Sequence, residues 1–86
     1  MKKLHKYNDP GHGWLRVPLK ELQRVGIAQT ISGCSYQHGK HVYLEEDSDA
    51  PKYLNAIGRN NVDIVNHYTD NRSHIRRYSD FCVRLA

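Results

Sequence analysis

The chain is short, and its length limits the fold more than any other feature. Its 86 residues are enough for one hydrophobic core but not for two. A chain of this size buries only roughly 60–65% of the surface that it exposes when extended, so long loops would be costly to order. Hydrophobic residues make up 38% and charged residues 26%, which is typical of a folded chain. We therefore expect a single domain over residues 1–86, without a deep catalytic cleft.

Glycine and proline divide the chain into short elements. Pro18 can begin a helix and Gly26 can end one, and apolar residues between them recur at helical spacing. The same signals recur at Pro51 and Gly58, where Ser48 or Asp49 could provide the N-cap. The sequence therefore predicts two short helices, over residues 18–25 and from about residue 51 to Gly58.

The strands are predicted from alternation and turn residues. Residues 12–17 alternate after a turn, and His38-Gly39 is placed as the turn of a tight hairpin. In the second hairpin strand, Val42 and Leu44 should face the core and Tyr43 the opposite side. Further strand signals are Val62, Ile64 and Tyr68, then Ile75, and finally Phe81, Val83 and Leu85 at the chain end.

These elements predict an α+β fold, in which a small antiparallel sheet of four or five strands is covered on one face by two short helices. Residues 1–7 contain Lys2, Lys3 and Lys6, and we expect them to form a frayed basic tail.

The best candidate contact face lies near the C-terminus, in the predicted strand that follows residues 69–72. Arginines alternate there with side chains that can stack, which suits phosphates, carboxylates or bases. Its members are Arg72, His74, Arg76, Arg77 and Tyr78. The alternative is a solvated edge strand whose arginines block pairing with other sheets. The net charge of +4 suits either interpretation.

A second group of binding candidates lies in the middle of the chain. His12 stands between two glycines beside Trp14, and the acidic segment is preceded by an aromatic residue. The full group is His12, Trp14, Tyr43, Glu45, Glu46 and Asp47. A structural role for His12 and helix capping for the acidic segment are the alternatives.

Metal binding and catalysis are weakly indicated. Cys34, His38 and His41 match no zinc spacing, and the acidic segment lacks the order of an EF-hand loop. Cys34 and Cys82 have no CxxC partner and are expected to be partly buried packing residues, although the two thiols could also meet in space. We expect no metal, no cofactor and no enzymatic activity.

Three segments also indicate a family. The strings DPGHGWL, within residues 8–18, and YLEED, within residues 42–50, together with Ser35-Tyr36-Gln37, resemble a family of small uncharacterised proteins encoded by bacteriophages, plasmids and other mobile bacterial DNA. The resemblance covers most of the chain and implies no reaction. It implies a context in which small accessory proteins bind and redirect a host protein or a defence complex.

Our first functional expectation is therefore a non-catalytic accessory protein that binds a host or defence protein as an inhibitor or modulator. The alternative is a nucleic-acid-binding regulatory module that uses the basic C-terminal hairpin. We find no signal peptide and no apolar run of membrane-spanning length, and so expect the cytoplasm of a bacterial host and no membrane partner. A homodimer through an edge strand remains open.

Overall fold

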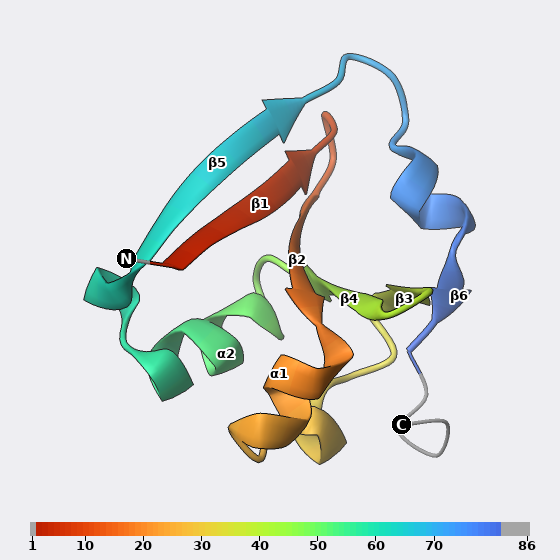
Figure 1. The fold of residues 1–86 in the computed structure, drawn as a ribbon. Coiled ribbons are helices and arrows are strands. Elements are labelled where there is room, and N and C mark those ends of the chain that lie inside the picture. The colour runs from red at the N-terminus through yellow and green to blue at the C-terminus, as the bar shows by residue number, and fades with distance from the viewer. Residues whose placement is uncertain (1, 82–86) are drawn as a thin grey trace.

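The computed structural model describes residues 2–81. It is of the α+β class, with a six-stranded sheet covered on one face by two short helices (Figure 1). The strands are β1 (Lys2–Asn8), β2 (Gly13–Pro18), β3 (Tyr36–His38), β4 (His41–Glu45), β5 (Val62–Tyr68) and β6 (Ser79–Asp80). The helices are α1 (Leu19–Arg24) and α2 (Ala50–Ile57), with short 3₁₀ turns η1 (Ala28–Thr30), η2 (Arg59–Asn61) and η3 (His74–Arg77). The predicted class is confirmed, although the sheet has more strands than the four or five expected.

The sheet is mixed rather than antiparallel. Its strands lie in the order β5-β1-β2-β4-β3-β6, and β5 runs parallel to β1 while all other neighbours are antiparallel. The chain reaches β5 through α2, which crosses beneath the sheet, and such a crossover returns a strand in parallel. The strands joined by the Asp9–His12 turn and by the Gly39–Lys40 turn form ordinary antiparallel hairpins.

Strand β1 shows that the prediction of a frayed tail over residues 1–7 was wrong. Residues 2–8 pair along their whole length with β5, and the C-terminal half of the strand pairs with β2. Leu4 is buried in the main core, and two of the lysines reach acids on the helix side: Lys6 lies 2.9 Å from Glu46 and Lys2 lies 3.4 Å from Glu21. The lysines therefore belong to an ordered strand, held by partners far away in the sequence.

Both predicted helices are confirmed to within two residues. Pro18 directly precedes α1, and Gly26 follows it with a φ of 79°. Pro51 lies in the first turn of α2, and Gly58 ends that helix with a φ of 86°. Side chains larger than glycine rarely adopt such φ values, so these two positions set where the helices stop.

The predicted hairpin is also present, displaced by one residue. Its turn is Gly39–Lys40, with Gly39 at a φ of 60°, and His38 pairs with His41. The alternation predicted for β4 is confirmed as well. Val42 and Leu44 lie in the main core under the helices, whereas Tyr43 lies in a second cluster on the other side of the sheet.

The main core fills the space between the sheet and the helices. It contains Leu4, Leu15, Val17, Leu22, Ala28, Ile31, Val42, Leu44, Ala50, Tyr53, Leu54 and Phe81. Each fully buried aliphatic side chain contributes about 1.5–3 kcal/mol. Tyr53 is fully buried, and its hydroxyl donates to Glu21 at 3.2 Å, so its polar atom is satisfied inside the core.

The arginine-rich segment after β5 is not a strand, so the predicted C-terminal hairpin is wrong. Its residues form the 3₁₀ turn η3, in which Ser73 Oγ accepts from the Ile75 amide at 3.2 Å. The chain then reaches β6 at the opposite end of the sheet from β5. Ser73 is bound by a residue distant in sequence, Asp9, and this contact favours a turn here. The predicted strand over Phe81, Val83 and Leu85 lies largely outside the described residues.

Two further features concern single elements. Cys34 is exposed, which corrects the expectation of a partly buried thiol, and Cys82 lies outside the described residues. Between residues 2 and 81, neither helix is long and apolar enough to cross a bilayer.

Candidate functional site

The sheet face away from the helices, here called the open face, has a distinct composition. Because alternate residues of a strand point to opposite faces, residues next to the core positions Leu4, Leu15 and Leu44 project to this side. By the strand registers it bears Lys3, His5 and Tyr7 from β1, Trp14 and Arg16 from β2, Tyr36 and His38 from β3, His41, Tyr43 and Glu45 from β4, and Asp63, Val65 and His67 from β5. Aromatic and imidazole rings therefore gather on one side of the molecule and aliphatic side chains on the other.

Part of the open face is covered by η3. Ile75 is fully buried there against Trp14 and Tyr43, which are 2% and 7% exposed. The sequence predicted Trp14 and Tyr43 to be binding residues, but the structure buries both in this second cluster. Burial, followed by the neighbouring Tyr78, raises the pKa of Tyr43. The buried Trp14 Nε1 has no hydrogen-bond partner among the described residues.

A buried ion pair holds η3 in place. The Asp9 side chain is 1% exposed, and Arg76 donates to it through Nε at 2.7 Å and Nη2 at 3.0 Å. The backbone amides of Ser73, Gly11 and His12 also donate to this carboxylate, at 2.9–3.0 Å. The Arg76 hydrogen bonds hold the pKa of Asp9 far below its usual range, against the opposing effect of burial. Arg76 was predicted as a contact residue, and its guanidinium is instead engaged in fastening η3 to the β1–β2 turn.

Beside η3, a set of rings remains at least partly accessible. We call it the aromatic–histidine surface; it consists of His5, Tyr7, His38, His67, His74 and Tyr78. Tyr7 and His67 stack with centroids 4.8 Å apart and planes 13° apart, and His67 also bonds to His5, with 2.9 Å between His5 Nδ1 and His67 Nε2. At the other end, His38 and Tyr78 stack at 4.2 Å and 7°.

The two ends of this surface are bridged by His74. Its ring lies 6.5 Å from Tyr7 and 5.5 Å from Tyr78, in edge-on geometry with both. Of the predicted contact residues, His74 and Tyr78 are thus brought into one surface. His5, Tyr7 and His67 were not predicted, because the lysine-rich residues 1–7 have the composition of a tail and because β1 and β5 pair across about sixty residues of sequence. The alternation of His5 and Tyr7 with Leu4 and Lys6 was the available signal.

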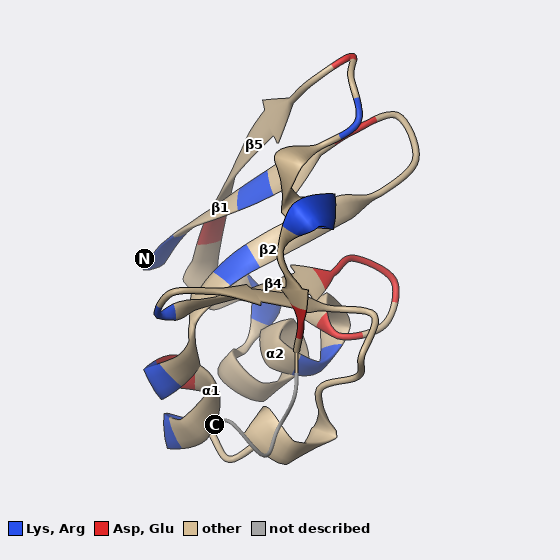
Figure 2. Cartoon of the chain, turned by 90° about the vertical axis from the view of Figure 1, so that its right-hand side faces the viewer, with Lys and Arg blue, Asp and Glu red and all other residues tan. Residues whose placement is uncertain are grey.

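Cationic groups stand around this surface. The Arg16 guanidinium carbon lies 5.6 Å from the Tyr7 ring centroid, a cation–π arrangement. Arg72, Arg77 and Lys3 are exposed. Among the ion pairs of residues 2–81, none involves these four side chains. Figure 2 shows Lys and Arg at β1, β2 and η3, and acidic residues gathered in the β4–α2 connection.

His41 does not contribute to this charge. Burial, and then the nearby Arg16, lower the pKa of His41, so its imidazole is neutral at neutral pH. The permanent positive charges beside the rings are those of Arg16, Arg72, Arg77 and Lys3.

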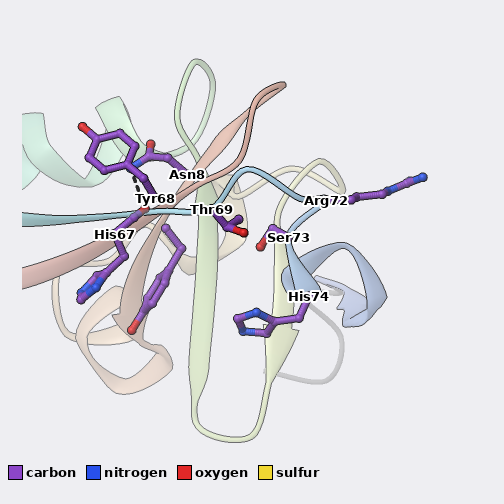
Figure 3. Close-up of a pocket in the computed structure, with 8 residues that line it drawn as sticks. Asn8, His67, Tyr68, Thr69, Arg72, Ser73 and His74 are labelled. Carbon is purple, nitrogen blue, oxygen red and sulfur yellow. Dashed lines mark hydrogen bonds between the residues drawn. The ribbon is translucent and has the colours of Figure 1, made fainter.

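A pocket of about 340 Å³ opens between β5 and η3 at one end of the aromatic–histidine surface. Its lining is Tyr7, Asn8, His67, Tyr68, Thr69, Arg72, Ser73 and His74. Figure 3 shows the His67 and His74 rings on the same side of β5, whereas Tyr68 lies on its other side and Arg72 extends outward. Rings with a few polar groups in a pocket of this size suit a planar ligand with polar edges.

The acidic segment is used internally. Glu45 accepts from the amides of Asp47 and Ser48 and from the Ser48 hydroxyl at 2.9–3.1 Å, which closes the turn after β4. His12 Nδ1 lies 3.9 Å from Glu45, and Glu46 pairs with Lys6. Glu45 and Glu46 are thus structural in this arrangement, while Asp47 stays exposed.

Asp49 holds the N-cap position of α2 but does not cap it with its side chain. The carboxylate is fully buried and accepts from Ser32, Ser35 and Lys52 at 2.6–3.1 Å. Burial raises the pKa of Asp49, but these hydrogen bonds outweigh it and leave the pKa below its usual value. The prediction that Asp49 caps α2 with its side chain is therefore wrong. Its carboxylate instead joins α2 to the segment before β3, which contains Ser32 and Ser35.

No cluster of three or more His, Cys, Asp or Glu side chains within residues 2–81 is arranged to hold a metal ion. Comparison with protein-family models, with curated proteins and with solved structures found no match. The family resemblance therefore stays a prediction.

Proposed function

We propose that the protein binds single-stranded nucleic acid through the aromatic–histidine surface. The observation that supports this most is the gathering of accessible rings on an open sheet face, beside arginines that have no carboxylate partner among the described residues. Open sheets that present aromatic rings bind single-stranded RNA by stacking its unpaired bases, and every base has a face that can stack.

In this arrangement the rings and cations have separate roles. Bases stack at the two ends of the surface, where Tyr7 and His67 form one pair and His38 and Tyr78 form the other. Arg72 and Arg77 extend beside them and attract the phosphates, which gives affinity without sequence information. The two helices are short and packed beneath the sheet, which does not suit insertion into the major groove of a duplex.

The first expectation from the sequence, a non-catalytic accessory protein that binds a host or defence protein in the bacterial cytoplasm, stays a prediction. The accessible part of the open face favours the alternative, because it consists mainly of imidazole and phenol rings with cations. Protein-binding surfaces are likewise rich in tyrosine and arginine, but their cores are more apolar than this face, on which Val65 is the single aliphatic residue that the registers place.

The test is fluorescence anisotropy with labelled single-stranded RNA and DNA of mixed sequence and with the matching duplex. We expect the single strands to bind more tightly than the duplex. If about three phosphates are contacted, affinity should fall roughly 20-fold between about 50 and 200 mM salt, from a slope of about 0.7 per phosphate.

Two substitutions test whether binding takes place on this face. His67→Ala should weaken binding by about 5- to 150-fold, the range of about 1–3 kcal/mol for one stacked base. Arg77→Ala should lower both affinity and salt dependence, while the matched Arg59→Ala, on exposed η2, should change neither. Absence of binding by any strand, or equal losses in Arg77→Ala and Arg59→Ala, would refute the proposal.

A further inference from the structure

The outer edge of β5 is the longest open strand edge in the described part of the chain. β5 spans seven residues at one end of the sheet, and β1 is its sole neighbouring strand between residues 2 and 81 (Figure 1). The strand at the opposite end, β6, has two residues. Natural edges of this length are commonly protected by lysine, proline or a bulge, and β5 contains neither lysine nor proline.

The hydrogen bonds show which backbone groups of β5 point outward. The Thr69 amide donates to the Asn8 carbonyl at 3.0 Å, so Thr69 faces β1. Successive residues of a strand direct their backbone groups to alternate sides. His67, Val65 and Asp63 therefore also face β1. The amides and carbonyls that point away from the sheet belong to Val62, Ile64, Asn66 and Tyr68.

Along the full length of β5, these outward groups are self-complementary in one register, the one that uses all four of them. When a second copy of β5 lies antiparallel with its Val65 opposite Val65, Ile64 faces Asn66 of the second copy and Val62 faces Tyr68. These are the residues whose amides and carbonyls point outward, so each donor meets an acceptor, as an isologous contact requires. A shift by one residue would place outward groups opposite inward ones.

The side chains fit the same register. On the open face, Asp63 stands directly opposite His67 of the second copy, and the symmetry makes this pair twice. A favourable pair of side chains directly opposite each other on neighbouring strands stabilises a sheet by roughly 0.2–1 kcal/mol. On the other face Tyr68, which is 79% exposed and the one large hydrophobic residue so exposed among residues 2–81, comes next to Val62 of the second copy.

We propose that two copies of the chain pair through β5 in this antiparallel register and form one continuous sheet. The interface is small and each copy has a net charge of +4, so the dimer should be weak, with a dissociation constant in roughly the micromolar range. The two-fold axis of the dimer is perpendicular to the sheet, so the open faces of the two copies lie on the same side of the continuous sheet. This proposal does not depend on nucleic-acid binding.

Sedimentation velocity from about 5 to about 500 µM tests the proposal, because a weak dimer forms within that range. We expect the mass to rise from 10.0 kDa toward twice that value with concentration. Asn66→Pro removes an outward amide that β1 does not use, and it should leave a monomer with an unchanged circular dichroism spectrum. A wild-type chain that stays monomeric at the highest concentration would overturn the proposal.

A charge exchange tests the register. Asp63→Lys places a cation opposite His67 of the second copy and should weaken the dimer. Adding His67→Asp to Asp63→Lys places a carboxylate opposite the introduced lysine and should restore the dimer, which damage to folding would not do. If the dimer persists in both Asn66→Pro and Asp63→Lys, it forms through another edge, and this β5 pairing is overturned. A double variant that does not regain the dimer would also overturn it.

Discussion

The strongest structural prediction concerns Asp9. Asp9→Ala removes a buried carboxylate that accepts from Arg76 and from the amides of Ser73, Gly11 and His12. After the change, Arg76 loses its carboxylate partner, while its guanidinium still lies 5.1 Å from the Trp14 ring centroid, and the three amides lose their acceptor. The turn η3 should then separate from the β1–β2 turn, because no other ion pair among the described residues joins them.

The size of the effect follows from burial. Removal of one partner from a buried ion pair costs about 3–5 kcal/mol. Asp9 is 1% exposed but Arg76 is 22% exposed, so its guanidinium can regain some hydration, and we expect the lower end, about 3 kcal/mol. In a domain of this size about 1 kcal/mol shifts the melting temperature by about 4–8 °C, so Asp9→Ala should lower it by roughly 12–24 °C.

Thermal and urea unfolding followed by circular dichroism would measure this loss. Asp70→Ala, at an exposed acid in the β5–η3 connection, is the matched control and should change the free energy of unfolding by less than about 0.5 kcal/mol. Arg76→Ala should destabilise strongly and its exposed neighbour Arg77→Ala should not. A cost below about 1 kcal/mol for Asp9→Ala, or equal costs for the two arginines, would refute the structural role of the pair.

Three further predictions concern the helix side of the sheet. The Arg24 hydrogen bonds lower the pKa of Glu21 from 4.5 to about 2, so the ionised Glu21 stabilises the fold above its ordinary pKa and loses this effect as the pH falls to about 2. In a Glu21→Gln variant the melting temperature should fall less steeply between these two pH values. An unchanged slope would contradict this role of Glu21. Leu44→Ala empties a fully buried site and should cost about 2–5 kcal/mol in urea unfolding, whereas a cost below about 1 kcal/mol would mean that this site is loosely packed. Gly58→Ala forces a side chain to a φ of 86° with its Cβ 2.8 Å from Asn61 Nδ2 and should cost about 1–2 kcal/mol, while a neutral result would show that α2 ends differently.

The elements with local signals were predictable from the sequence. The two helices have proline and glycine at their ends, and the β3–β4 turn contains a glycine at positive φ. These residues restrict the backbone wherever the rest of the chain lies, so their effect can be inferred without knowledge of the fold. The side of the sheet to which Val42, Tyr43 and Leu44 point also followed from alternation alone.

The missed features depend on contacts between distant segments. In β1, Leu4 is the one buried residue, and lysines stand on both sides of it in the sequence. The segment therefore has the composition of a solvated tail. Its strand form depends on pairing with β5 and β2 at once. Likewise η3 has the alternating composition of an edge strand, and its turn is stabilised by Asp9, which lies 67 residues away in the sequence from Arg76. The candidate site was missed in part for the same reason, since Tyr7 and His67 meet through the β1–β5 pair.

The two faces of the sheet differ in how their side chains are held. Aliphatic side chains between the sheet and the helices form the main core and exclude water. On the open face the rings are held by one another: His67 stacks on Tyr7 and bonds to His5, and Tyr78 stacks on His38. Side chains that are already ordered lose less conformational entropy when a ligand binds. The ring pairs are thus already ordered for the proposed stacking of bases, and η3, fastened by Asp9, positions His74 and Tyr78 among them.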